Sequence, residues 1–473
     1  MSITSLNFAG FVLLVLTVYY LIPRRPQNLW LLLASLVFYT TWSWVLVLVL
    51  ATLAVANGFV GRRLPAGRSG RRAWLVGGIG LNLLALAAFK YAGFFVGEAG
   101  RLLAAAGLAP STAILTILIP VGLSYRILEN ISLLVDTYRG QVSATLDPVE
   151  LGLYSFFFPK LLSGPIERAR SLLPQLAAPR VVDNDVLARG FTLITVGLVR
   201  KLVIADTLAA QVGPGVFVTP LDYGAPRLLF ALVAYTFALY NDFAGYTDIV
   251  RGVSGLFGFR LMPNFAAPFF SRSLAEIWQR WHITLCAWLR DYIYLPLSRA
   301  LLRRKANPRA AANLVLPPMA AMLISGLWHD LSLRMLAWGG LIGVYLVAGR
   351  LAGEGRPTAP RDYWPAWKQA TRMILISGAI CGAMIPFRMD LPVAWEFLRG
   401  LGHGWAVVLP ALPLASMVAL SLALDAAQSR GRDEAVFLRW PPFVQSLVLA
   451  LAWLAVFLAT RFESPKPFVY QGF

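Results

Sequence analysis

The chain has 473 residues, of which 58% are hydrophobic and 14% are charged, and its mean hydropathy is +0.65. Long apolar runs recur along the whole sequence and leave no room for a soluble domain of useful size. The formal charge of +19 does not indicate a nucleic-acid partner, because the basic residues lie in short loops between apolar runs, where anionic lipid headgroups are the expected counter-charges.

These properties predict an all-α polytopic membrane protein, since only hydrogen bonding within each segment satisfies so much backbone in a lipid bilayer. Two cysteines, Cys286 and Cys381, lie in apolar segments. They indicate neither a disulfide framework nor a metal site.

The first apolar run, residues 6–22, has no basic flank before it and no small-residue cleavage signature after it, so we interpret it as a retained span. Residues 28–60 are too long for one upright helix and predict two spans that meet near residues 40–43. Arg24 and Arg25, and the arginine-rich loop 61–72, all fall on the cytoplasmic side if the N-terminus is extracytoplasmic.

Residues 74–96 and 114–135 predict further spans. The second contains Arg126 and Glu129, which are three residues apart and can pair on one helix face, as a structural ion pair or as part of a site. Residues 151–162 are apolar but too short to cross, and they precede a Ser-Gly-Pro-Ile-Glu-Arg sequence that includes Pro165 and Arg168. This pattern indicates a re-entrant or interfacial helix.

Residues 191–204 and 228–246 predict two more spans, and the second runs into a polar stretch that contains Asn241, Tyr246 and Asp248. Residues 257–270 are punctuated by glycine and proline and should be irregular. The remaining predicted spans are residues 313–328, 333–348, 373–386, 406–424 and 443–460, which brings the expected total to about twelve. We expect one transmembrane domain over residues 1–473, with N-terminal helices at 5–100, a core at about 110–390 and C-terminal helices at 404–462.

Residues 275–289 predict a single helix that is polar on more than one side. On such a helix Trp278, His282, Leu285 and Leu289 share one stripe, and Arg280 lies on another. This distribution suits a bundle interior or a cavity. A later carboxylate, Asp291, can pair with Arg280 or with Arg290.

Two of the three histidines follow a tryptophan in apolar surroundings: His282 after Trp281, and His329 after Trp328. An ionisable side chain at membrane depth is costly and suggests function. A neutral imidazole in a dry site can accept a proton from an alcohol nucleophile. The alternative is that each histidine forms a structural hydrogen bond between helices. Zinc is a weak third option, because no clear third ligand is present.

Several ordered motifs resemble the membrane-bound O-acyltransferases, specifically the bacterial branch that acetylates alginate and other exopolysaccharides and is related to the D-alanyl transfer proteins of teichoic acid. The motifs are FFPKLLSGPIER at 157–168, YNDFAGYTDIVRG at 240–252, WQRWHITLCAWLRDYIY at 278–294, GLWH at 326–329 and a later Phe387-Arg388. The sequence departs from the family at Asp330, where relatives usually carry glycine.

The resemblance implies a ring of about twelve transmembrane helices, with re-entrant segments, around a central funnel or tunnel. By the same resemblance, His329 matches the essential histidine and His282 the supporting one. The implied activity moves an acetyl group from a cytoplasmic donor, acetyl-CoA, to a hydroxyl of an exopolysaccharide or to a periplasmic partner, with no bound cofactor. Residues expected to bind substrate or line the tunnel are Trp278, Trp281, Arg280, Trp328, Asp248, Asn241, Tyr246, Pro165 and Arg168.

The implied setting is the bacterial inner membrane, with a periplasmic SGNH-type acetyltransferase or a carrier protein as a further partner. Two alternative functions stay open from the residues. One is acyl or aminoacyl transfer from a carrier protein, and the other is a transporter or flippase of a polysaccharide-assembly system.

Overall fold

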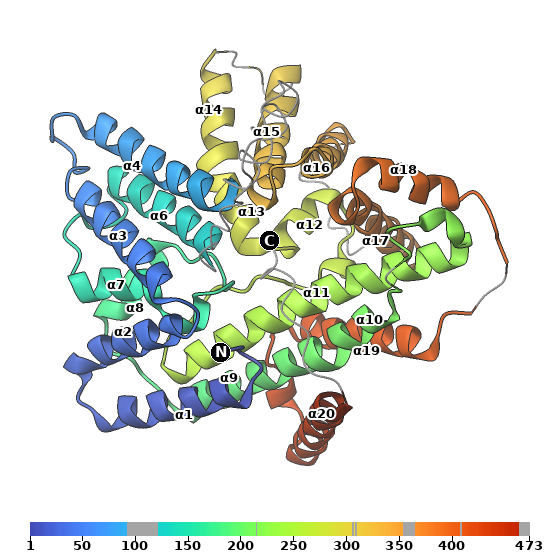
Figure 1. The fold of residues 1–473 in the computed structure, drawn as a ribbon, viewed down its shortest axis with the longest axis horizontal. Helices are drawn as coiled ribbons and strands as arrows, with labels where there is room; N and C mark the ends of the chain where they lie inside the picture. The colour runs from blue at the N-terminus through green and yellow to red at the C-terminus, as the bar shows by residue number, and fades with distance from the viewer. Residues whose placement is uncertain are drawn as a thin grey trace, which may run out of the picture. The chain divides into compact units, whose positions relative to one another are not determined.

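The computed structural model describes residues 1–91, 122–213, 215–304, 307, 310–352, 365–406 and 409–462. All regular elements in these ranges are helices (Figure 1). The contacts divide the chain into two compact units, Met1–Val186 with Val253–Leu261, and Leu187–Gly252 with Met262–Phe473. The predicted all-α fold class is confirmed.

Seven of the described helices are long and apolar enough to cross a membrane. They are Trp44–Gly61, Arg71–Tyr91, Ala225–Leu256, Ala311–His329, Ala366–Arg388, Leu412–Gly431 and Pro442–Arg461. The expected total of about twelve spans stays a prediction. The expected end of one span at residue 96 and the start of the next at residue 114 lie outside the described residues.

The first unit begins with four helices whose boundaries follow the sequence signals. Ser5 caps the first helix by accepting a hydrogen bond from the Phe8 N–H, and Pro23 separates the first helix from the second. The predicted break in residues 28–60 is confirmed, because the chain turns at residues 41–43. The helices are α1 (Leu6–Leu21), α2 (Arg24–Thr40), α3 (Trp44–Gly61) and α4 (Arg71–Leu86).

The rest of the first unit is organised around the buried carboxylate of Glu129 on α6 (Leu123–Tyr138). The predicted pair with Arg126 is present at 2.5 Å, and the Lys160 ammonium lies 2.8 Å from the same carboxylate. Arg126 also donates to the backbone carbonyls of Tyr154 and Ser155, near the C-terminus of α7 (Pro148–Phe156). The cluster therefore supplies hydrogen-bond donors to the last carbonyl groups of α7, which have no partner within the helix. This favours a structural role for the Arg126–Glu129 ion pair. A further short helix, α8 (Ala169–Ala177), follows.

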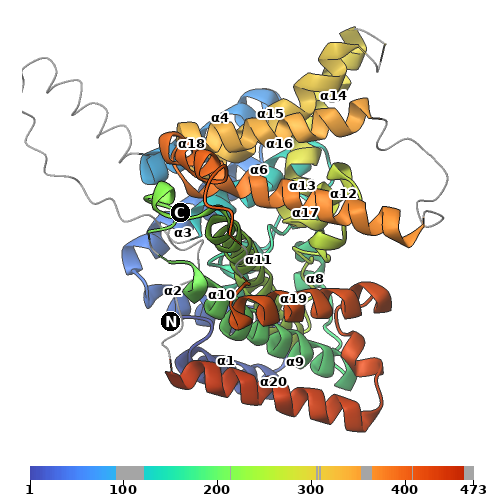
Figure 2. The same ribbon diagram turned by 90° about the vertical axis from the view of Figure 1, so that its right-hand side faces the viewer.

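The second unit contains most of the long helices. It is built from α9 (Asn184–Leu198), a π-helical turn (Val199–Ala205), α10 (Asp206–Gln211), α11 (Ala225–Leu256), α12 (Leu274–Arg280), α13 (Ile283–Leu289), α14 (Leu295–Arg304), α15 (Ala311–His329), α16 (Leu333–Leu351), α17 (Ala366–Arg388), α18 (Leu391–Gly400), α19 (Leu412–Gly431) and α20 (Pro442–Phe462). Figure 2 shows α15, α16 and α17 packed in sequence. The ring of Phe191 on α9 stacks on that of Trp453 on α20.

Glycines allow the closest helix contacts of this unit. A Cβ atom on Gly197 of α9 would lie 2.6 Å from the carbonyl oxygen of Gly245 on α11. On α15 and α16, a Cβ on Gly326 would collide with the carbonyl oxygen of Met335, and one on Gly339 with that of Met322. Such contacts between small residues are the usual way in which membrane helices approach closely. They set the position of α16 against the end of α15.

The predicted continuous helix over residues 275–289 is wrong. α12 ends at Arg280, Trp281 is extended, and His282 has a φ of 42° before α13 begins. The irregular segment 257–270, which was predicted as such, passes alongside the break: the Ala266 N–H donates to the Arg280 carbonyl, and the Ile283 N–H donates to the Asn264 carbonyl. Backbone groups that the break releases are thus satisfied by another part of the chain.

Candidate active site

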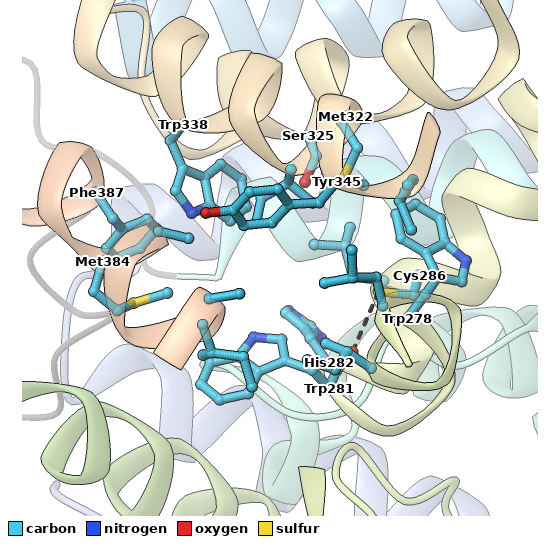
Figure 3. Close-up of a pocket in the computed structure, with 18 of the residues that line it drawn as sticks. Trp278, Trp281, His282, Cys286, Met322, Ser325, Trp338, Tyr345, Met384 and Phe387 are labelled. Atoms are coloured by element: carbon cyan, nitrogen blue, oxygen red, sulfur yellow. Dashed lines mark hydrogen bonds between the residues drawn. The ribbon is translucent and has the colours of Figure 1, made fainter. Parts of the chain in front are cut away.

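A cavity of about 100 Å³ lies within the second unit and is bordered by α11, α12, α13, α15, α16 and α17 (Figure 3). Its lining is mostly apolar and includes both His282 and His329. Two residues that are 47 positions apart in the sequence (329 − 282) are therefore brought to one space. Figure 3 shows Trp338, Tyr345 and Ser325 across the cavity from Trp281 and His282.

His282 occupies the break between α12 and α13 and is 3% exposed. Its ring packs edge-to-face on Phe243, with ring centroids 4.8 Å apart. Burial holds the pKa of His282 well below its ordinary value, because desolvation disfavours the charged imidazolium. The residue is therefore neutral at physiological pH.

The hydrogen bonds around Asn264 determine which nitrogen of His282 carries the proton. The backbone N–H and the hydroxyl of Thr284 lie 3.3 Å and 2.7 Å from Asn264 Oδ1, and the backbone N–H can only donate. The Asn264 atom is therefore the acceptor, so His282 Nδ1, at 3.1 Å, carries a proton and donates to it. This tautomer leaves His282 Nε2 as a hydrogen-bond acceptor.

His329 is the last residue of α15 and is 4% exposed. Its ring is enclosed by three aromatic rings, Trp328 at 4.9 Å, Trp338 at 5.3 Å and Phe387 at 5.6 Å between centroids. His329 is therefore held in an aromatic enclosure on the wall opposite the break at His282.

The opposite wall contributes polar groups that the sequence did not single out. The indole N–H of Trp338 on α16 is buried and makes no hydrogen bond with the residues that the structure describes. Ser325 and Tyr345 also line the cavity. Their hydroxyls, together with the indole N–H, are the donors available to a bound molecule. Cys286 lines it too, but burial raises the pKa of its thiol to about 12, so it is a poor nucleophile.

Of the other predicted site residues, Trp278 and Trp281 line the cavity. Arg280 pairs instead with Glu276 at 2.7 Å, and Trp328 packs behind His329. Asp291 pairs with Arg290 at 2.9 Å, so only one of its two expected partners is used. Asp330 lies 3.6 Å from Arg334 in a partly exposed ion pair, and it does not line the cavity.

Asn241, Asp248 and Tyr246 lie on α11 and do not line the cavity. Asn241 accepts a hydrogen bond from the fully buried Arg200, whose Nη2 lies 2.6 Å from Asp425 on α19. Asp248 is 3.7 Å from the Arg200 Nε. Pro165 and Arg168 are residues of the first unit, and neither lines the cavity.

The buried ion pair is connected to the cavity wall through aromatic packing. The Tyr240 hydroxyl donates to the Asp425 carboxylate at 2.8 Å, and the Tyr240 ring lies 6.0 Å from Trp281. Asn264, Trp338 and Tyr345 were missed by sequence reasoning. Asn264 follows a proline in the irregular segment, and the two aromatic residues lie in an apolar span, so only their positions in the fold distinguish them. No cluster of three potential metal ligands occurs among the described residues.

The fold and the cavity together describe a helical protein with membrane-capable helices and two histidines in one apolar space. The sequence model of the membrane-bound O-acyltransferase family matches residues 36–385, which is well over half of the chain. The chain therefore belongs to this family and is an acyltransferase.

Curated relatives agree with the assignment. The chain is 36% identical over 396 residues to the probable alginate O-acetylase AlgI of Pseudomonas aeruginosa, covering 83% of this chain and 72% of that protein. It is 30% identical over 422 residues to the peptidoglycan O-acetyltransferase of Helicobacter pylori, covering 83% and 74%. A more distant similarity, 28% over 223 residues, links it to the teichoic acid D-alanyltransferase of Bacillus subtilis, covering 46% and 56%.

Proposed function

We propose that this protein is a membrane-embedded O-acetyltransferase that moves an acetyl group from acetyl-CoA to a hydroxyl group of an exported polysaccharide or of a periplasmic acceptor protein. The observation that carries the proposal is that His282 and His329 line one small apolar cavity, with polar donors on its far wall. The O-acetylase and O-acetyltransferase relatives support an acetyl group and a cell-envelope acceptor.

In the proposed reaction the acceptor hydroxyl oxygen attacks the carbonyl carbon of the thioester. His329 accepts the hydroxyl proton as the new C–O bond forms. The C–S bond then breaks, and the leaving thiolate takes up the proton from the His329 imidazolium. Charge and atoms balance without a cofactor. Direct transfer is favoured over a cysteine acyl-enzyme because the Cys286 thiol stays protonated.

The remaining groups bind and polarise the substrate. His282 Nε2 is an acceptor and holds a second donor group of the acceptor molecule, because the one proton of the attacking hydroxyl goes to His329. Its neutral state avoids a second charge in the cavity. The Trp338 N–H donates to the carbonyl oxygen, where negative charge develops in the tetrahedral intermediate. The apolar lining excludes water and so limits hydrolysis of the thioester.

The setting we propose is a bacterial inner membrane with the N-terminus extracytoplasmic and the donor on the cytoplasmic side, where the basic loops lie. A periplasmic SGNH-type acetyltransferase is the proposed recipient when the polysaccharide is not acetylated directly. The second candidate, aminoacyl or acyl transfer from a carrier protein, is favoured by the similarity to the D-alanyltransferase alone. A transporter or flippase would not need a histidine pair in an apolar cavity.

The proposal is tested with purified protein in liposomes that enclose the acceptor, with radiolabelled acetyl-CoA supplied outside. His329→Ala should lower kcat by about a hundred- to ten-thousand-fold, the usual loss for removal of a general base. His282→Ala should lower it less, because His282 positions the acceptor molecule and does not take the hydroxyl proton. Both variants should accumulate in the membrane and elute as monodisperse protein.

Normal acetyl transfer by His329→Ala would contradict the mechanism, and a larger loss in His282→Ala would exchange the two roles. Transfer from an acylated carrier protein, with none from acetyl-CoA, would establish the second candidate. Movement of unmodified polysaccharide that continues in His329→Ala would support a transporter instead.

A further inference from the structure

A second cavity lies in the first unit, which contains none of the residues of the histidine cavity. It has a volume of about 430 Å³ and is formed by α2, α3, α6, α7 and the loop before α7. This size falls within the range of roughly 300–1,000 Å³ that is typical of sites for small organic molecules. The lining is predominantly apolar, with Leu36, Ala54, Val55, Phe59, Leu133 and Phe156 among its side chains.

The few polar side chains deep in this cavity are already hydrogen-bonded within the protein. The Asn57 amide donates to the Leu53 carbonyl and exchanges hydrogen bonds with Asn82. The Thr137 hydroxyl donates to the Leu133 carbonyl. The described residues of the interior therefore offer no polar side chain that needs a partner, and the cavity suits a hydrocarbon chain better than a nucleotide or a sugar.

One rim of the cavity is cationic. Arg62, the residue directly after α3, lines the cavity and is exposed, and its side chain makes no hydrogen bond or ion pair with the residues that the structure describes. Arg68, in the loop that follows, and Arg72, in the first turn of α4, are also exposed, but neither lines the cavity. The Ser143 hydroxyl lies on the same lining. A ligand whose head is anionic would complement this rim.

The depth of Arg62 in the bilayer follows from the length of α3. Its 18 residues are strongly apolar. At 1.5 Å per residue they span about 27 Å, which nearly matches the roughly 30 Å hydrocarbon core of a bilayer. Arg62 therefore lies where α3 leaves the hydrocarbon, at the level of the phosphates. The cavity runs inward from this level, because its other lining residues on α3 extend back to Ala51.

From these observations we propose that this cavity is a binding site for an anionic phospholipid, with one acyl chain in the apolar cavity and the phosphate on Arg62. The two halves of the site are separable: the cavity recognises the chain, and the arginine recognises the charge. A lipid bound at this site would stabilise the packing of α2, α3, α6 and α7 against one another. The proposal is independent of the acyl-transfer mechanism.

The test is native mass spectrometry of the full-length protein in neutral detergent, with equimolar dioleoyl phosphatidylglycerol and dioleoyl phosphatidylcholine. We expect one phosphatidylglycerol to be retained in preference to phosphatidylcholine. Arg62→Gln should reduce retention of phosphatidylglycerol about fivefold, the effect expected from one basic residue at a membrane surface, and leave phosphatidylcholine unchanged. Ala54→Leu, which adds bulk to the lining, should reduce retention of both lipids.

Matched controls separate the site from general effects of charge and bulk. Arg303→Gln removes an exposed arginine of α14, and Thr52→Leu adds bulk to an exposed position of α3 that does not line the cavity. Both should bind as the wild type does. Ala51→Leu serves as a second filling variant if Ala54→Leu does not elute as monodisperse protein.

Equal retention of the two lipids by the wild type, or unchanged preference in Arg62→Gln, would overturn the proposal. So would full phosphatidylglycerol retention in a well-folded filling variant. Displacement of the lipid by inorganic phosphate alone would indicate a simple anion site at the rim, which also contradicts a site that needs the chain.

Discussion

Asn264 decides which nitrogen of His282 carries the proton. Its side-chain oxygen receives the Thr284 backbone N–H and hydroxyl as well as the His282 Nδ1–H, so the imidazole is held in one tautomer and one orientation. A histidine that can rotate or exchange tautomers would present an N–H in place of the Nε2 lone pair for part of the time. Positioning of this kind affects the turnover step more than substrate binding.

We therefore expect Asn264→Leu to lower kcat about tenfold, the equivalent of one lost hydrogen bond, with little change in KM. Steady-state acetyl transfer from acetyl-CoA is the measurement. Thr284→Val is the matched control, because it removes only the hydroxyl donor to Asn264 and leaves the bond to His282. An Asn264→Leu enzyme with wild-type kcat would show that the tautomer is not held by this residue.

Single residues were predictable where their chemistry is conspicuous in the sequence. His282 and His329 are rare ionisable groups in apolar runs, and both line the cavity. Asn264 and Trp338 carry no such signal, because asparagines in irregular segments and tryptophans in spans are ordinary. Their roles arise from contacts between segments far apart in the sequence.

The elements that position the histidines are held by close helix contacts. α15 and α16 meet through Gly326 and Gly339, and a Cβ on either would collide with backbone of the other helix. Because backbone cannot move as a side chain can, the helices would have to separate. His329 lies at the end of α15 and Trp338 lies beside Gly339 on α16, so separation would change the spacing of these two groups.

Gly339→Ala should destabilise the protein by about 1–3 kcal/mol, the typical effect of overpacking, and should reduce acetyl transfer. Gly340→Ala is the control on the next residue, where an added Cβ would meet only Leu323 Cδ2 at 4.0 Å. Thermal unfolding in detergent and the transfer assay measure the two effects. Equal unfolding temperatures for the two variants would contradict the close contact.

Element prediction succeeded where one segment decides its own structure and failed where a second segment intervenes. The turn at residues 41–43 and the irregular run 257–270 were predicted from local chemistry. The break at His282 was not, because residues 275–289 have helical periodicity throughout. Hydrogen bonds that Asn264 accepts and one that the Ala266 N–H donates stabilise the break, and periodicity contains no information about them.

At the scale of the whole molecule, a buried ion pair within the second unit joins the π-helical turn Val199–Ala205 to α19. Arg200 and Asp425 are 2% and 0% exposed and lie 2.6 Å apart. Tyr240 donates to the Asp425 carboxylate, and Arg200 donates to Asn241 and Gln428. The polar stretch at 240–248 was recognised in the sequence, but its partner on α19 lies almost 180 residues away and could not be inferred.

Removing one partner leaves the other charge buried and uncompensated, so Asp425→Ala should destabilise the protein by about 3–5 kcal/mol. The double variant Arg200→Met/Asp425→Leu should recover most of that loss, because it removes both charges at similar volume. Asp330→Ala, which opens a partly exposed pair, is the stability control. Unfolding temperatures in detergent are the measurement, and a double variant no more stable than Asp425→Ala would contradict the coupling.

The Arg200–Asp425 pair also limits which C-terminal segments of related proteins can replace that of this chain in a hybrid protein. The family match ends at residue 385, and Asp425 lies beyond it. A hybrid that joins residues 1–400 of this chain to the tail of a relative would bury Arg200 without its carboxylate unless the donor tail supplies an acidic residue at the same place. Helix α19 and the π-helical turn that carries Arg200 should therefore come from the same parent protein in a hybrid. Hybrids that separate Arg200 from its carboxylate partner should be unstable.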